Sequence, residues 1–525
     1  MKKALISIFL SFALLVACGG GNKNTPNDQG PANPDTNSDE PLPDGDPPVN
    51  PYLADSPWPI WHRNLYAQAS SPLDAPTAAD AAAGLITKAF VPLPTNGATE
   101  LGGPSPWSQI STRYPDGSRI VWQSNQTQVW KLIENGATFE IAGNYVLDAQ
   151  GRILNPHWAI MILADGHVLV SDASKRLLYE LADNPVDPRS AITLVRTYEI
   201  DQSRTPGKLI KYIVSYDGHI IYLTDKSKIG AIRLSDWNLV ATGTLPDTSF
   251  HNNFPMDETG GIYIVTPTQM IKVQWDGVSF TTSWTVPYDS RGETLNGRYG
   301  SGTTPTLMGF GPDQDHLVVI VDALSASNLV AFWRDEIPGD WDGVSGYTNY
   351  KRIAAVQPLA GIDPSISNWA VENSPVVRGY DIAIAQYNGL RPTWTCANVP
   401  GVEKYTWSPA ARSFTRAFNN STVSINSVLT YSAKTNLVYG VGLNGECTWT
   451  FYALDWNTGG TAFSCPLGDS EDWGDGGVQQ SLSDDCTFTY GSNTGTVRIG
   501  VTDPTRQAEC RATYDELYGL EKRGF

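Results

Sequence analysis

The stretch YIVSYDGHIIYLTD, residues 212–225, decides the fold. An apolar strand runs into an Asp-Gly turn, and a second strand leaves the turn with apolar side chains such as Ile220 and Tyr222 on alternate positions. Alternation with a period of two indicates a β-strand, and an Asp-Gly pair between two such runs indicates a tight turn. The stretch is therefore a predicted antiparallel hairpin.

Seven related copies surround it. They are YPDGSRIVW from Tyr114, IMILADGHVLVSD from Ile160, FPMDETGGIYIVT from Phe254, TPTLMGFGPDQDHLVVIVD from Thr304, SPVVRGYDIAIAQ from Ser374, VLTYSAKTNLVYGVG from Val428 and SLSDDCTFTYGSN from Ser481. A spacing of roughly 40 to 60 residues is the period of a four-stranded blade with variable loops. We therefore expect an all-β fold, a single closed β-propeller of eight blades, with seven blades as the alternative.

Closure of the ring is expected between its two ends. A strand after Leu85 is predicted to pair with carboxy-terminal strands around Val497 to Val501, which removes the exposed edges. Helical patterns are confined to short segments, residues 80–87 and 513–521. Because unrelated functions are found on propellers, the fold alone predicts neither ligand nor reaction.

The amino terminus, MKKALISIFLSFALLVACGGG, places two lysines before an apolar run that ends at Ala17. The run is too short to span a bilayer as a mature helix and is typical of a signal peptide, residues 1–17. Leu15-Val16-Ala17-Cys18 resembles the bacterial lipobox, which implies acylation of Cys18 by palmitate and related chains. Gly19 favours anchoring in the outer membrane, on its periplasmic face or at the cell surface. The alternative is an ordinary secretory signal that carries a Cys near its cleavage site.

Composition divides the rest of the chain. Residues 18–57 are rich in Gly, Asn, Pro, Asp and Ser and are predicted to be a disordered polar linker, followed by the propeller domain, residues 58–525. The net charge of −18 argues against a nucleic-acid partner, since phosphates require a basic surface. The predicted partners are the membrane, through the lipid anchor, and a carbohydrate, a small polar ligand or an envelope protein.

Five cysteines remain besides Cys18, and all lie in the last third of the chain: Cys396, Cys447, Cys465, Cys486 and Cys510. In an oxidising compartment we expect two disulfides and one free thiol. Among fifteen schemes we favour Cys447 with Cys465 and Cys486 with Cys510, because each pair brackets neighbouring strands. No Cys-x-x-Cys, no Cys/His zinc pattern and no EF-hand spacing is present, so no metal site is predicted.

The segment FYALDWNTGG, residues 451–460, resembles the blade repeat of quinoprotein-type (PQQ-like) propellers, and WPIWHRN, residues 58–64, resembles the opening of many such proteins. The resemblance implies the propeller superfamily. Its quinone dehydrogenases usually carry a vicinal Cys-Cys pair and often a haem motif, which this chain lacks. We therefore carry over no catalytic residue from that family, and the cofactor remains unknown.

Candidate site residues lie before the innermost strands, whose entry loops face the central channel. His157 and His251 precede two of these strands. Arg298 and Tyr299 precede another, together with Ser301 and Thr303, and Asn373 repeats the polar pattern in a later copy. Hydroxyl groups at such positions either bind a polar ligand or tie adjacent blades together.

Two tryptophans, Trp394 and Trp407, fall in a predicted insertion between Gly389 and Thr422. We expect them to form an aromatic lip that stacks on a sugar ring or an apolar ligand. His167 and His219 follow the Asp-Gly turn of successive copies. This repeated position is explained either by turn geometry or by a pair of side chains on one face that binds a metal or exchanges protons.

The sequence leaves the question of an enzyme open, and three functions follow in order of support. The first is an envelope-anchored protein that binds a partner or polar ligand at the channel mouth, favoured because hydrolase, zinc-protease and nucleotide-binding signatures are missing. The second is a lyase-type enzyme with His157 or His251 as base, Tyr299 as acid and Arg298 neutralising a carboxylate. The third is a quinone-dependent dehydrogenase.

Overall fold

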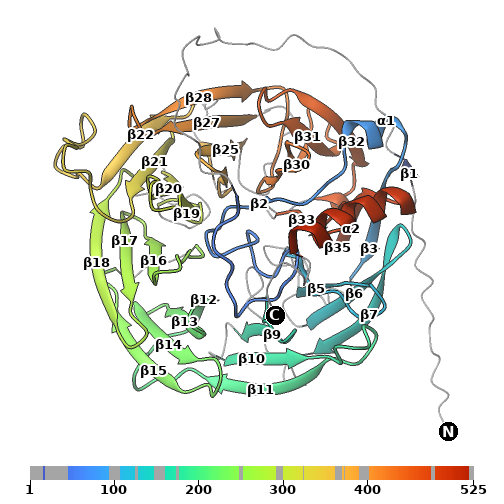
Figure 1. Ribbon diagram of the computed structural model, residues 1–525, viewed down its shortest axis with the longest axis horizontal. Helices are drawn as coiled ribbons and strands as arrows, with labels where there is room; N and C mark the ends of the chain where they lie inside the picture. The colour runs from blue at the N-terminus through green and yellow to red at the C-terminus, as the bar shows by residue number, and fades with distance from the viewer. Residues whose placement is uncertain are drawn as a thin grey trace.

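The computed structural model describes residues 16–17, 45–93, 107–124, 128–146, 160–172, 177–247, 252–290, 300–322, 324, 326–360, 369–371, 373–388, 401–474, 479–492 and 494–518. Its sheets form a ring around a central axis, in chain order (Figure 1). Eight of the nine sheets among these residues are blades of a β-propeller, and the ninth is a two-stranded ribbon. The prediction of an eight-bladed, all-β propeller is confirmed.

The first four blades follow one another from the innermost strand outward. Blade one contains β4 (Gln109–Ile110), β5 (Ile120–Ser124), β6 (Gln128–Asn135) and β7 (Thr138–Val146); blade two contains β8 (Met161–Ile162), β9 (Val168–Asp172), β10 (Leu177–Ala182) and β11 (Thr193–Glu199). Blade three contains β12 (Leu209–Val214), β13 (His219–Thr224), β14 (Lys228–Arg233) and β15 (Leu239–Thr244). Blade four contains β16 (Gly261–Val265), β17 (Gln269–Trp275) and β18 (Phe280–Pro287), with a bridge from Met256 to Ile262 on the inner side.

The other four blades complete the ring. Blade five contains β19 (Thr306–Met308), β20 (Leu317–Val321), β21 (Asn328–Trp333) and β22 (Ile353–Pro358); blade six contains β24 (Val376–Arg378), β25 (Asp381–Ala385), β27 (Val402–Ser408) and β28 (Ser413–Asn420). The ribbon pairs β23 (Trp369–Ala370) with β26 (Tyr387–Asn388). Blade seven contains β29 (Thr430–Ser432), β30 (Leu437–Leu443), β31 (Trp449–Asp455) and β32 (Thr461–Gly468), and β2 (Ser70–Ser71) runs parallel to β29. Blade eight contains β33 (Ser481–Leu482), β34 (Thr487–Gly491) and β35 (Gly495–Val501).

Blade eight is closed by the amino-terminal strand β3 (Ile86–Pro92), which pairs with β35. The antiparallel register runs from Ile86 opposite Val501 to Pro92 opposite Gly495. The short strand β1 (Val16–Ala17) pairs with the outer edge of β3. The predicted closure is therefore confirmed.

Burial explains why the middle strands of the blades have apolar sequences and the outer strands have polar ones. β9 and β13 are buried at every position because neighbouring blades cover both faces, whereas β11 is exposed or half-buried throughout. An Asp-Gly turn reverses the chain between the innermost strand and the second strand of each of these two blades. Gly166 and Gly218 adopt φ of +85° and +79°, in the left-handed region that favours glycine.

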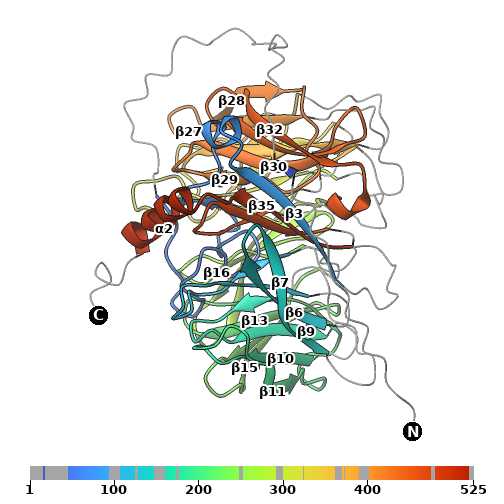
Figure 2. The ribbon, with the colours of Figure 1, turned by 90° about the vertical axis from the view of Figure 1, so that its right-hand side faces the viewer.

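The helix α2 (Pro504–Tyr518) follows β35 and lies on one face of the ring, which we call the helix face (Figure 2). It begins earlier than predicted because Asp503 accepts a hydrogen bond from the Arg506 backbone N–H (2.9 Å) and Pro504 occupies the first helical position. The shorter helices are α1 (Ala78–Ala82) and the 3₁₀ turn η1 (Glu471–Trp473). No helix among the described residues combines the length and the apolar character that crossing a membrane requires.

A disulfide joins Cys486, in the turn before β34, to Cys510 of α2, which confirms one predicted pair. Cys447 and Cys465 are disulfide-bonded as well, but their predicted pairing with each other is wrong, because Cys465 lies opposite Phe451 in the β31–β32 register whereas Cys447 lies beyond Trp449, which is opposite Gly468. No described cysteine is free, and Cys396 lies outside the described residues.

Residues 45–57, which the sequence assigns to the linker, pack against the blades. Leu53 is 7% exposed and forms a bridge with Leu163 next to β8, and Ala54 donates a backbone hydrogen bond to Ile162 (2.9 Å). The part of the chain that belongs to the propeller therefore begins earlier than residue 58.

Candidate functional site

The centre of the ring is filled by the chain itself. Residues 45–73, which we call the axial segment, cross the axis inside the innermost strands (Figure 1). Their backbone oxygens accept hydrogen bonds from N–H groups of blades one, two, four, five, six and seven, at Ile110, Ile162, Met256, Leu307, Val377 and Tyr431. The Asn50 amide donates to Val214 of blade three (2.8 Å), and His62 donates to Gln479 beside blade eight (3.1 Å). One segment thus binds all eight blades.

The axial segment is strained where it turns. His62, Arg63, Ala67 and Ala69 have φ of 50°, 72°, 57° and 57°, in the left-handed region that costs a non-glycine residue roughly 1–2 kcal/mol. A hydrogen bond from Ala69 N–H to the His62 carbonyl (3.0 Å) closes the turn. The turn lets successive carbonyl groups point at successive blades, so the bonds to the blades offset the strain.

His62 is a buried side chain of this turn. It is 1% exposed, and its ring lies 5.1 Å from that of Trp107 in an edge-to-face contact. Burial lowers the pKa of His62 to about 4, although its hydrogen bond to Gln479 opposes the shift. The imidazole is therefore neutral at neutral pH and serves in packing.

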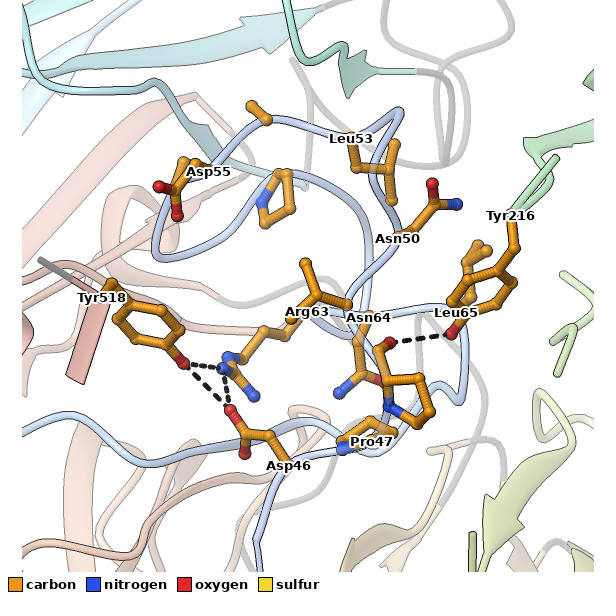
Figure 3. Close-up of a pocket in the computed structure, with 15 residues that line it drawn as sticks. Asp46, Pro47, Asn50, Leu53, Asp55, Arg63, Asn64, Leu65, Tyr216 and Tyr518 are labelled. Atoms are coloured by element: carbon orange, nitrogen blue, oxygen red, sulfur yellow. Dashed lines mark hydrogen bonds and ion pairs between the residues drawn. The ribbon is translucent and has the colours of Figure 1, made fainter. Parts of the chain in front are cut away.

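A charged cluster holds the start of the axial segment on the helix face (Figure 3). Asp46 accepts hydrogen bonds from Arg63 (2.5 Å), from Arg378 of β24 (2.6 Å) and from the Tyr518 hydroxyl of α2 (3.0 Å). Burial opposes ionisation of Asp46, but the two guanidinium groups hold its pKa below the usual value. The cluster links the axial segment to blade six and to the last helix.

A cavity of about 110 Å³ lies beside this cluster at the mouth of the axis. Its walls include Asn50, Asp55 and Arg63, and Tyr216 closes one side by donating a hydrogen bond to the Pro48 carbonyl (3.1 Å; Figure 3). Burial raises the pKa of Tyr216 well above its usual value, so its hydroxyl remains a donor.

A larger groove of about 570 Å³ opens on the helix face between blades two and three. Its walls combine both signs of charge, and the lining side chains are Tyr52, Asp165, Glu180, Arg196, Asp217, His219 and Arg233. A third hollow of about 240 Å³ shares Asp217 with the groove and Tyr216 with the axial cavity. The three hollows are therefore neighbours around the axial segment.

Several predicted site residues lie outside the described residues. They are His157, His251, Arg298, Tyr299, Trp394 and the predicted lipidation site Cys18. The structure therefore does not test whether the residues of the predicted lyase site lie together, and these assignments stay predictions.

Ser301, Thr303 and Asn373 lie at the entries of innermost strands, as predicted, and all three are buried. Ser301 and Thr303 share a hydrogen bond between their hydroxyls (2.9 Å), and the Thr303 hydroxyl accepts the N–H of Val321 (3.1 Å). The Asn373 amide donates to the carbonyls of Asn426 and Ser427 in the next blade (3.0 Å each). Of the two interpretations, these contacts favour the tying of strands and adjacent blades.

Trp407 lies in β27, a strand of blade six, and the expectation that residues 402–420 form an insertion is wrong. The indole is 1% exposed, donates a hydrogen bond to Asp315 (2.8 Å) and packs edge-to-face on Trp333 (5.8 Å). It therefore contributes to packing between blades five and six and does not reach a surface lip.

A planar quinone on the axis would have to displace the axial segment together with its bonds to the blades. Trp58, Trp61 and His62 belong to this segment, and each is at most 1% exposed. The residues present do not fit such a cofactor, and we derive no reaction step through one.

Comparisons with known proteins agree with this architecture. No model of a known protein family matches the chain. An uncharacterized protein of Archaeoglobus fulgidus is 32% identical over 443 residues, which cover 79% of this chain and 81% of that protein.

Two solved structures share the fold. The quinohemoprotein alcohol dehydrogenase of Comamonas testosteroni superposes with a TM-score of 0.52 at 13% identity, covering 85% of this chain and 80% of the other. A europium-containing methanol dehydrogenase superposes with a TM-score of 0.50 at 10% identity, covering 90% and 96%. At such low identity these likenesses show the β-propeller fold alone.

Proposed function

The chain belongs to the family of the uncharacterized archaeal protein, and from this premise we propose that it is a lipid-anchored binding protein whose helix face holds a polar partner of the cell envelope. The observation that carries the proposal is the contrast between the filled centre of the ring and the hollows beside it. The centre is filled by residues 45–73, whereas three neighbouring hollows whose walls carry charged side chains open around it on the helix face. Convergent polar groups beside a concave surface are typical of ligand sites.

The chain that follows the proposed lipid anchor enters the propeller on the same face. Gly45 lies 27 residues after Cys18, and a chain of this length reaches at most about 97 Å. Asp46 then enters the charged cluster beside Tyr518 on the helix face. Acylation of Cys18 would therefore keep the helix face within this distance of the outer membrane and favour partners in the same compartment.

Site-specific cross-linking tests the binding face. A photoreactive amino acid would replace Tyr52, which lines the groove and is 38% exposed, and in a matched control Val146, which is 51% exposed at the end of the outer strand β7. In native cells we expect a discrete adduct from position 52 and none from position 146. Adducts from both positions, or from neither, would contradict the proposal.

The anchor is tested separately with Cys18→Ala. Once its signal peptide is removed, we expect the variant to leave the detergent phase in a phase-partitioning assay while its thermal unfolding stays that of the wild type, because β3 and β35 close the ring and β1 (Val16–Ala17), which belongs to the motif, pairs only with the outer edge of β3. Equal partitioning of both proteins after confirmed removal of the signal peptide would show that Cys18 is not the lipid site.

A further inference from the structure

Blade two carries a cluster of three metal-binding side chain types on the helix face. The side chains of Asp165, His167 and Glu180 place one ligand atom each within 4.8 Å of one another. His167 Nδ1 lies 2.5 Å from Glu180 Oε1 and 3.4 Å from Asp165 Oδ2. No other described cluster of three or more such groups combines a histidine with two carboxylates.

The local backbone structure brings the three ligand atoms together. Asp165 and His167 flank Gly166 in the turn before β9, and Glu180 comes from β10, opposite Leu169. The second oxygen of each carboxylate is already held: Asp165 Oδ1 accepts the His167 backbone N–H (3.0 Å), and Glu180 Oε2 lies 2.6 Å from Arg196 Nε. Each carboxylate therefore keeps one oxygen directed to the imidazole.

Blade three provides an internal comparison, because it repeats the turn without the full cluster. His219 follows Asp217-Gly218 as His167 follows Asp165-Gly166. Two positions further along each strand, Leu169 pairs with Glu180, whereas Ile221 pairs with Ala231. The glutamate is therefore an addition of blade two and is not required by the turn.

Burial of the additional glutamate lowers the stability of the fold. The Glu180 side chain is 3% exposed, and a buried carboxylate destabilises a protein unless charges and hydrogen bonds compensate it. Asp165 and Glu180 also line the groove of about 570 Å³, so a cation between them would lie in its wall. The side chain of His167 is 30% exposed, which leaves an approach from solvent.

We propose that Asp165, His167 and Glu180 bind a divalent first-row transition metal such as Zn²⁺, with His167 Nδ1 and one oxygen of each carboxylate as ligands. One imidazole and two carboxylates suit such ions, and a site with three protein ligands keeps positions open for water or a polar ligand from the groove. Arg196 orients Glu180 as an outer-shell partner. This site does not depend on the partner proposed above.

Zinc titration of the tag-free, chelator-treated protein tests the site by calorimetry. We expect one equivalent of Zn²⁺ to bind the wild type and His167→Gln to weaken binding by more than about tenfold. His219→Gln is the matched control, since it removes the corresponding histidine of blade three, and should bind as the wild type does. Absence of saturable 1:1 binding to the wild type, or equal losses in the two variants, would overturn the proposal.

Cobalt provides a second readout that reports the ligands. Co²⁺ bound at the site should give a visible absorption band that is absent from His167→Gln and Glu180→Gln and retained in His219→Gln. Circular dichroism of the same samples shows whether each variant is folded. A band that persists in folded His167→Gln would place the metal elsewhere and overturn the proposal.

Discussion

Two amino-terminal segments hold the ring together, one at its rim and one at its centre. At the rim, β3 pairs with β35 over a continuous antiparallel register, and the disulfide from Cys486 to Cys510 joins the same blade to α2. At the centre, the axial segment begins in a charged cluster, carries strained residues and makes single hydrogen bonds to successive blades. Regular pairing closes the ring, whereas irregular backbone is stable at the centre only because eight blades supply its partners.

The largest effect should come from breaking the rim. Ending the chain at Gly491 removes β35 and α2, so that β3 loses its partner and blade eight its outer half. We expect loss of cooperative thermal unfolding, measured by calorimetry, because an open ring exposes strand edges. A matched truncation that ends the chain at Tyr518 should melt as the full chain does. A protein ending at Gly491 that melts as sharply would contradict closure by β35.

The sequence predicts the rim well because strand pairing follows from local patterns that repeat along the chain. It does not predict the centre, since residues 45–57 have the composition of a linker and gain their partners only from distant blades. The sequence did not predict strand β27, for another reason. Glu403 and Lys404 interrupt its apolar pattern, yet both are buried, and Lys404 pairs with Asp381 (2.6 Å).

The candidate sites, too, could be predicted from the sequence only in part. The repeated Asp-Gly-His pattern identifies His167 and His219, and the structure confirms their equivalent turns. Sequence could not show that Glu180 reaches His167, because this contact depends on strand register. An acidic residue in the apolar run LLYELA, residues 177–182, was the available signal, since an isolated buried carboxylate needs a partner.

Asp46→Asn tests the charged cluster at the centre and should have the next largest effect. It removes the carboxylate charge that Arg63 and Arg378 share, at sites where the two guanidinium side chains are only 11% and 13% exposed. We expect a loss of about 3 kcal/mol in the free energy of unfolding, measured by denaturant titration. Asp340→Asn removes an exposed partner of Arg412 and should change nothing measurable. Equal effects of both substitutions would show that the cluster does not stabilise the centre.

Glu134→Gln tests the seam between blades one and eight. Burial and the neighbouring Asp485 raise the pKa of Glu134 to about 8 from 4.5, although Arg498 opposes the shift. The folded protein therefore binds more protons than the unfolded chain between these values, so stability should fall as pH rises from 4.5 to about 8.

The substitution should remove this decline, which we expect to be on the order of 1–2 kcal/mol because solvent screens a side chain that is 28% exposed. Melting temperatures across this pH range measure the slope. Glu140→Gln, at an exposed ion pair with Arg189, should keep the slope of the wild type. Parallel profiles for Glu134→Gln and the wild type would show that Glu134 does not ionise in this range.

The smallest effect concerns strain at the centre and is measured as a difference between two substitutions. Ala67 and Ala75 are both fully buried, but only Ala67 has a left-handed φ, 57°. Replacement by glycine removes one buried methyl group and adds chain entropy at either position, which costs about 1–2 kcal/mol. At Ala67 the same change releases about 1–2 kcal/mol of strain. Ala67→Gly should therefore be nearly neutral and Ala75→Gly destabilising in denaturant titration, and equal losses would mean that the axial segment stores no such strain.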